Sequence, residues 1–414
     1  MFTKKGVRLG EKDLIGDALV DGDVVRVMAT RARPAPAGPE GEGEGSSAAA
    51  TAALPTPPKA ARPVCVLSAD GKTVKLANGV DMPLLGLGTS GLSGSDCREA
   101  VELALERGWR HLFCDPMGNE TAVKAVVETS SVPRHELFLS TLLTALDHGY
   151  EAAHAAVDRS LKQLGVEAVD LMVVHWPGAW LSEQKTWTLD VAQKRCRVVS
   201  EEMRRETWRA LEERHRAGHI RALGVANYTQ KHLEELLGFA TVPPAVYVGE
   251  HHPYHRQLPL VTWCKARGIM FMAHTPLGGA VTHENFKQRP VDDDVVAEIA
   301  DRLRRTPAQV ALRWSLQDCI AVVPRAKQRD HLAENAASFD FDLSDNDLDR
   351  IDRLDKKVAL AWDPAEADSL DPHNPFLEMA RGEIGKLMSK VNMINANGPG
   401  MGEKVARAAA QKKL

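Results

Sequence analysis

The sequence lacks the features that mark several large classes of protein. No uninterrupted apolar run approaches the roughly 20 residues that a membrane-spanning helix needs. The net charge is only −4 over 414 residues, which gives no overall attraction to nucleic acid. The six cysteines lie far apart, and no pair has the spacing of a metal site. We therefore expect reduced thiols, a cytoplasmic location, and no membrane or nucleic-acid partner.

Composition divides the chain into four segments. Residues 1–30 contain an Asp-Gly turn that leads into a short β-branched strand, and they resemble the closing half of a ubiquitin-like module. Residues 31–63 are rich in Pro, Gly, Ala, Ser and Glu, as in a flexible linker. Residues 64–360 carry a regular pattern, and residues 361–414 form a C-terminal extension. About 30 residues bury too little surface to fold alone, so the first segment is expected to be an incomplete module.

The regular segment alternates short apolar runs with amphipathic helical stretches, such as 151–164 and 202–217. The runs are about five residues long and almost wholly apolar, as in a parallel sheet that is buried on both faces. Eight such strands are the number of a (β/α)8 barrel, the TIM-barrel fold of the α/β class. The predicted strands are 84–88, 110–113, 137–141, 169–175, 221–225, 245–249, 269–273 and 320–323.

A doubly wound dinucleotide-binding sheet is the alternative architecture. Gly86, Gly88 and Gly91 match the pattern G-x-G-x-x-G, and Asp115 follows the next strand at about the distance of a ribose-binding acid. That motif also requires a helix that opens at the third glycine. Here the helical pattern begins only near Asp96, so we favour the barrel.

Two polar residues stand where a barrel places its reactive groups, at the C-terminal ends of strands. His175 ends one apolar run and precedes an aromatic residue and a proline, so it should point into the barrel mouth. The alternative is a structural histidine whose hydrogen bonds are satisfied. Asn227 ends the next run, and its amide could hold a carboxamide through its paired donor and acceptor. The alternative there is a turn-forming asparagine.

Several short motifs, in order between residues 74 and 355, resemble the aldo-keto reductases. They include MPLLGLGT at 82–89, GWRH at 108–111, the run that ends at His175, GVANY at 224–228 and HPY at 252–254. The resemblance implies a barrel that passes hydride between a nicotinamide and the carbonyl of a small molecule. The implied cofactor is NADP(H), with NAD(H) as the alternative.

The same resemblance implies that most of the catalytic set has been replaced. The family's general acid is a tyrosine, tuned by a lysine and an aspartate, while a histidine orients the carbonyl. Phe113 stands at the aspartate position, and the tyrosine position is either deleted or filled by Met117. Leu142 stands at the lysine position. Only His175 remains as a predicted catalytic residue, and Asp115 could substitute for the aspartate only after a shift of register.

The cofactor positions are partly retained in this comparison. Asn227 matches an asparagine that binds the carboxamide, but Ala226 and Val248 replace the serine and glutamine that accompany it. His274 replaces a tyrosine that stacks on the nicotinamide, and His331 replaces an arginine that would bind the 2′-phosphate. The alternative for the basic stretch 323–335 is a solvated loop. The predicted cofactor contacts are Asn227, His274, Leu277, Arg325, Glu334 and Asn335.

Two functions stay open at this point. The first is a carbonyl oxidoreductase with impaired or altered catalysis, in which His175 donates the proton. The second is a pseudoenzyme that senses a nucleotide cofactor or serves as a scaffold in a larger assembly. A protein partner would contact the loop 178–199, which carries two tryptophans, or the amphipathic part of the C-terminal tail. The alternative for the tail is a solvated terminus.

Overall fold

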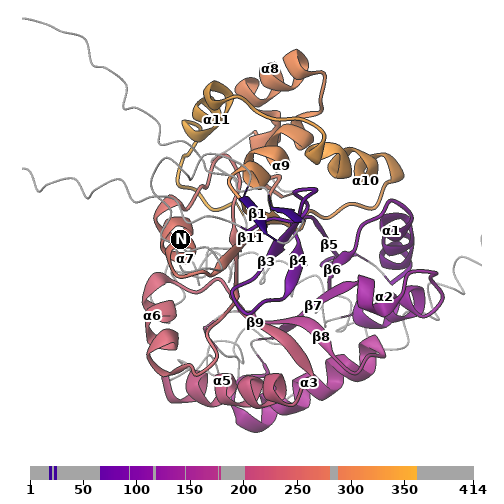
Figure 1. Cartoon of the computed structure of the whole chain (residues 1–414), viewed down its shortest axis with the longest axis vertical. Helices are drawn as coiled ribbons and strands as arrows, with labels where there is room; N and C mark the ends of the chain where they lie inside the picture. The colour runs from indigo at the N-terminus through magenta and orange to yellow at the C-terminus, as the bar shows by residue number, and fades with distance from the viewer. Residues whose placement is uncertain are drawn as a thin grey trace, which may run out of the picture.

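Eight parallel strands and the helices between them form a barrel (Figure 1). The computed structural model describes residues 18–20, 23–25, 66–92, 94–114, 118–144, 146–175, 177–178, 201–279 and 288–360. The predicted (β/α)8 barrel is confirmed. The doubly wound alternative is wrong, because the strands follow one another in chain order around the sheet and their order never reverses, as it would in a doubly wound sheet.

Each strand of the barrel overlaps one that the sequence predicts. The apolar runs form strands because both faces are covered, one by the other strands and one by helices. The strands are β5 (Gly86–Gly88), β6 (His111–Phe113), β7 (Phe138–Leu143), β8 (Val169–Val174), β9 (Ile220–Ala226), β10 (Val246–Glu250), β11 (Met270–His274) and β12 (Ala321–Val322).

The barrel closes between its first and last strands. Leu85 forms a parallel bridge with Val322, and the Val322 N–H donates to the carbonyl of Leu84 over 2.7 Å. A hairpin of β3 (Thr73–Lys75) and β4 (Asp81–Pro83) precedes β5. Its apolar side chains belong to the main core, and the Asn78 amide donates to the carbonyl of Arg221 near the start of β9. The hairpin therefore covers the N-terminal end of the barrel.

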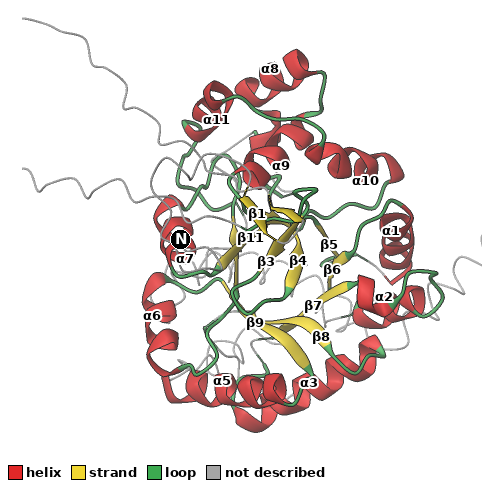
Figure 2. Ribbon diagram, in the orientation of Figure 1, coloured by secondary structure: helices red, strands yellow, loops and turns green. Residues whose placement is uncertain are grey.

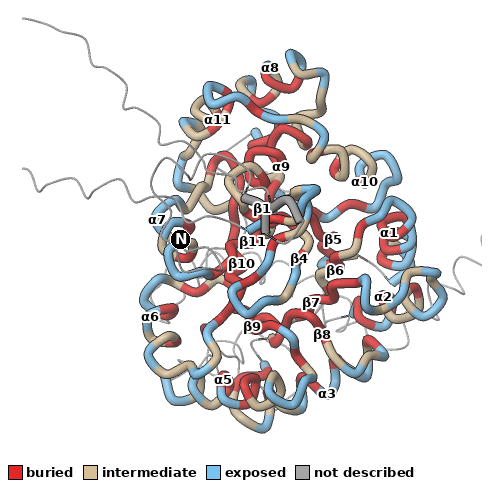
Figure 3. Tube along the Cα trace, viewed as in Figure 1, coloured by how far each residue is buried: buried red, intermediate tan, exposed pale blue. Residues whose placement is uncertain are grey.

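Most of the helices surround the barrel and turn their buried faces toward it, while α8 and α11 lie outside α9 (Figures 2 and 3). Helix α1 begins at Gly94, two residues before the predicted start near Asp96 and three residues after Gly91, the third glycine of the apparent motif. The helices are α1 (Gly94–Glu106), α2 (Glu120–Val127), α3 (Tyr150–Leu164), α5 (Glu201–Arg216), α6 (Gln230–Phe239), α7 (Leu258–Ala266), α8 (Asp294–Leu303), α9 (Pro307–Gln317), α10 (Arg329–Ala336) and α11 (Asp345–Asp352).

The body of the barrel contains a buried carboxylate with a complete set of partners. Asp170 on β8 is fully buried and lies 2.7 Å from Arg134 and 2.6 Å from Arg221. The backbone N–H of Leu139 also donates to it, over 2.8 Å. A buried charge is stable only when it is paired and hydrogen-bonded in this way. Asp170 therefore joins β7, β8 and β9 and the segment before β7 near the N-terminal end of the barrel.

A second apolar cluster holds α8, α9 and α11 together. It includes Ile299 on α8, Trp314 on α9 and Ile351 on α11. The Trp314 indole also donates to Asp352 over 2.9 Å. Helix α10 is tied to α9, because the Gln309 amide donates to the Glu334 carbonyl over 2.9 Å. This packing fixes the start of α9 and the face of α10 beside β12, where the cavity described below has its outer wall.

Other expectations have mixed outcomes. Strands β1 (Ala18–Val20) and β2 (Asp23–Val25) pair in antiparallel fashion around the Asp-Gly pair, while the ubiquitin-like interpretation stays a prediction. Three described cysteines, Cys97, Cys114 and Cys264, are buried free thiols, as expected. The expectation is wrong at Cys319, which is disulfide-bonded. Among the described helices, none has the length and apolar character needed to cross a membrane.

Candidate functional site

A cavity of about 800 Å³ opens at the C-terminal end of the barrel. All eight strands contribute to its lining, either with a residue near their C-terminal end or with the residue that follows them. This is where a (β/α)8 barrel gathers side chains from distant parts of the chain. The residues, in strand order, are Gly88, Phe113, Leu142, His175, Ala226, Val248, His274 and Val323.

Every site residue that the sequence predicts lies in the lining of this one cavity. The structure therefore brings together residues that are up to 160 positions apart in the chain, although their roles remain predictions. They are His175, Asn227, His274, Leu277, Arg325, Glu334 and Asn335. The positions of Asp115 and Met117, and nearly all of the loop 178–199 with the whole C-terminal tail, lie outside the described residues.

Several apolar side chains line the inner end of the cavity together with His175. Phe113 and Leu142, from β6 and β7, are partly buried and line the cavity with Ala226 and Val248. The His175 backbone N–H donates to the carbonyl of Leu143 over 2.9 Å, which continues the β8 ladder to the rim. The side chains at Phe113 and Leu142 therefore offer no charge and no proton donor beside His175.

No tyrosine lines the cavity, and all four tyrosines of the chain lie among the described residues. The Tyr150 hydroxyl donates to Glu213 over 2.6 Å, and the Tyr254 hydroxyl donates to Asp293 over 2.7 Å. The Tyr247 hydroxyl donates to the carbonyl of Tyr228 over 3.0 Å, and burial raises the pKa of Tyr228. Each phenol is thus placed away from the cavity, and none can act as an acid there.

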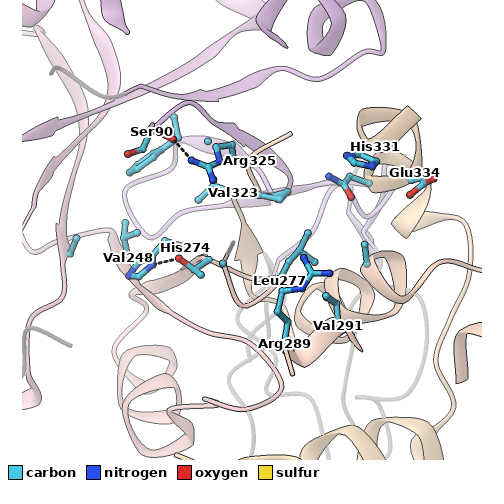
Figure 4. Close-up of a pocket in the computed structure, with 18 of the residues that line it drawn as sticks. Ser90, Val248, His274, Leu277, Arg289, Val291, Val323, Arg325, His331 and Glu334 are labelled. Atoms are coloured by element: carbon cyan, nitrogen blue, oxygen red, sulfur yellow. Dashed lines mark hydrogen bonds between the residues drawn. The ribbon is translucent and has the colours of Figure 1, made fainter. Parts of the chain in front are cut away.

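Asn227 and His274 are joined across the inner end, at the contact drawn beside His274 in Figure 4. Nε2 of His274 lies 3.0 Å from Oδ1 of Asn227, and its Nδ1 lies 3.0 Å from the hydroxyl of Thr275. Burial of the His274 ring lowers its pKa to about 4, so the ring is neutral at pH 7. Asn227 has a φ of 59°, a left-handed conformation that asparagine tolerates better than most residues.

The outer end of the cavity is polar and includes a cation. Nη1 of Arg325 donates to the carbonyl of Ser90 over 3.3 Å, as Figure 4 shows. Arg325 forms no ion pair with any carboxylate in the described part of the chain. His331 and Glu334, on α10, lie beyond it in the same view, and the neighbouring Asn335 is buried. This end therefore combines an uncompensated positive charge with amide and carboxylate groups.

The sequence does not point to two further parts of the lining. Arg289 lies in the wall and forms a two-point ion pair with Asp292, at 2.7 and 2.8 Å. The first turn of α9 also lines the cavity, at Thr306, Pro307 and Ala308. Thr306, Pro307 and Gln309 form a recognisable helix start, in which the side chains of Thr306 and Gln309 cap each other's backbone N–H groups. The pattern predicts the helix, but not that its positive end faces the cavity.

Among the described residues, no group of three His, Cys, Asp or Glu side chains is arranged to hold a metal ion. The groups present are instead suited to an elongated organic ligand with an anionic portion. Arg325 and the start of α9 favour negative charge, and the inner end favours a flat, mostly apolar group.

Known proteins resemble this chain over the barrel. Residues 84–356 match the Aldo/keto reductase family. The chain is 36% identical over 296 residues to glyoxal reductase from Bacillus subtilis (strain 168), covering 71% of this chain and 96% of that protein. It is 34% identical over 302 residues to morphine 6-dehydrogenase from Pseudomonas putida, covering 72% and 95%. Among solved structures, an aldo/keto reductase from Brucella melitensis aligns with a TM-score of 0.59 and 32% identity, covering 68% of this chain and 99% of that one.

Proposed function

The chain belongs to the aldo/keto reductase family, and on this premise we propose that it binds an NAD(P)(H) dinucleotide in the barrel-mouth cavity but reduces carbonyls poorly. When bound, the dinucleotide would supply or accept a hydride. One observation carries the proposal: the residues suited to hold a dinucleotide line the cavity, whereas no tyrosine or lysine is among the described residues that line it.

The cavity fits a dinucleotide in size and in the order of its groups. A volume of about 800 Å³ lies within the range of cofactor sites, roughly 300–1,000 Å³. Asn227 and His274 would hold the ring at the inner end, and Leu277 would lie along its path. Arg325 and the start of α9 would face the phosphates. Glu334 and Asn335 would contact the adenine.

The inner end offers little to the chemistry of carbonyl reduction. A carbonyl that accepts a hydride becomes an alkoxide, which needs a proton donor. With no phenol in the cavity, His175 is the candidate donor. Losing a positioned general acid costs about 10²- to 10⁴-fold in rate. We therefore expect slow reduction of a small carbonyl compound, with His175 as the single retained member of the catalytic set.

A cofactor-sensing pseudoenzyme is the second candidate, and a specific observation favours it. Phe113 and Leu142 line the cavity on the two strands before His175 and carry no polar group, while the outer end has Arg325 and its neighbours. Such a protein would report the cofactor to a partner. The predicted partner contacts, at 178–199 and 361–414, lie outside the described residues and remain predictions, as does a cytoplasmic location.

The experiment measures binding and turnover in the same samples. NADPH and NADH are titrated into the full chain, following tryptophan quenching, and a reactive aldehyde is then added under saturating cofactor. The Bacillus subtilis glyoxal reductase serves as the reference enzyme. We expect saturable binding with turnover at least about 100-fold below the reference. Turnover equal to the reference would contradict impaired chemistry, and no binding of either nucleotide would contradict the proposed function.

A further inference from the structure

The inner end of the cavity presents a hydrogen-bond donor whose partner is missing from the described residues. Oδ1 of Asn227 lies 3.0 Å from Nε2 of His274. Because Oδ1 can only accept, Nε2 must carry the proton, and Nδ1 of the neutral ring then accepts from the Thr275 hydroxyl. The Asn227 amide nitrogen, Nδ2, has no partner in the described part of the chain. Since Asn227 lines the cavity, this NH₂ group is what the side chain offers to a ligand.

The residues beside Asn227 supply no side-chain acceptor at this level. Ala226 and Val248 are paired in the parallel register of β9 and β10, and both line the cavity. Neither side chain has a polar atom. The Val248 carbonyl already accepts from the Asn227 backbone N–H over 2.9 Å. The NH₂ group of a carboxamide therefore finds no side-chain acceptor at these two positions.

We infer that this end of the cavity selects a pyridine ring that carries a carboxylate over one that carries a carboxamide. The preferred ligand is therefore a deamidated dinucleotide, with nicotinic acid in place of nicotinamide. The inference rests on the proposed function, which places the ring beside Asn227. It names the ligand class of that same site.

Elementary chemistry separates the two rings. A carboxamide would leave its NH₂ group without a side-chain acceptor at positions 226 and 248, and a poorly satisfied donor weakens binding. A carboxylate has only acceptors, and its bond to the Asn227 NH₂ group is charge-assisted. In the oxidised dinucleotide the pyridinium nitrogen is positive, so the ring and its carboxylate together are close to neutral. This reduces the cost of taking the carboxylate out of water.

The test compares ligands that differ only in this group. Calorimetric titration of the full chain at pH 7 uses NADP⁺, its nicotinic-acid counterpart, and 2′,5′-ADP, which lacks the ring. The NAD⁺ series with ADP is run in parallel, since His331 leaves the 2′-phosphate preference open. We expect the nicotinic-acid form to bind about tenfold more tightly than the nicotinamide form.

Two variants and a matched control locate the effect. His274→Phe removes the donor to Asn227 Oδ1, so the amide can turn and offer an acceptor, and the affinity ratio should fall toward one. Val248→Gln adds an acceptor and should shift the ratio toward the carboxamide. His331→Phe makes the same replacement at the outer end, on α10, and should leave the ratio unchanged. Only variants with a cooperative thermal transition are compared.

Each outcome decides the inference. The inference is supported if the nicotinic-acid form binds about tenfold more tightly than the nicotinamide form, and if this ratio falls in His274→Phe but not in His331→Phe. Equal or tighter binding of the nicotinamide form overturns it, and would mean that the His274 and Asn227 groups are oriented the other way. In that case, binding of 2′,5′-ADP or ADP would still leave the proposed function standing. If none of these nucleotides binds, the proposed function fails, and the inference fails with it.

Discussion

The two ends of the cavity differ in the chemistry of their side chains. The inner end combines His175, Asn227 and His274 with the apolar side chains of Phe113 and Leu142, while the outer end has Arg325 and polar groups from α10. In a (β/α)8 barrel these ends are built by different strands and loops. Under the proposed function, phosphate binding and carbonyl chemistry would depend on separate residues and could be lost separately. Membership of a family of reductases does not by itself establish reduction.

The largest expected effect comes from a variant that gives the inner end the catalytic groups that the family resemblance implies. In the variant Phe113→Asp, Met117→Tyr, Leu142→Lys, a phenol returns together with the ammonium that lowers its pKa. Aldehyde turnover should rise by about 10²- to 10⁴-fold. Leu142→Lys alone should give no gain, because the cavity holds no phenol for the lysine to tune. Steady-state NADPH oxidation checks both, and a large gain from the single change would contradict the proposed assignment of positions.

A change at the outer end should weaken dinucleotide binding and leave the inner end unaltered. Arg325→Gln removes a cation that forms no ion pair among the described residues, so dinucleotide affinity should fall about tenfold or more. Lys327→Gln is the matched control, because Lys327 is exposed, lies 3.6 Å from Asp96 and is not in the cavity lining. The dinucleotide affinity of Lys327→Gln should stay within about twofold of wild type. Calorimetry measures both, and equal losses in the two variants would contradict a specific role for Arg325.

The smallest expected effect is a loss of folding stability at low pH. The pKa of His274 is lowered by burial to about 4 in the folded chain, against about 6.5 when unfolded. The unfolded chain therefore binds a proton first, and stability that is present above pH 6.5 is lost as the pH falls toward 4. His274 should contribute about 1–2 kcal/mol to the loss between pH 7 and pH 5.

Urea unfolding at the two pH values measures this contribution. In His274→Phe, the difference in unfolding free energy between pH 7 and pH 5 should shrink by that amount. His331→Phe, at an exposed position, should leave it as in wild type. An unchanged pH dependence in His274→Phe would mean that the ring at the inner end is not desolvated.

The fold could be predicted because each strand is a short, wholly apolar run, and the topology of a barrel then places His175 and Asn227 at the mouth. The hydrogen bond between Asn227 and His274 could not be predicted, because it joins residues 47 positions apart through side-chain geometry. Arg289 was missed for a similar reason, since no local pattern marks its approach to the cavity. The oxidised state of Cys319 also depends on tertiary proximity, which spacing along the chain does not reveal.

The most direct test of the central claim is a single-turnover measurement. The full chain is saturated with NADPH and mixed with a reactive aldehyde, and the absorbance of the bound cofactor is followed beside that of the Bacillus subtilis glyoxal reductase. The account predicts that NADPH binds, and that its oxidation is at least about 100-fold slower than in the reference. Oxidation at the reference rate would contradict it, because the inner end would then supply a proton donor as effective as a tyrosine, although no tyrosine lines the cavity.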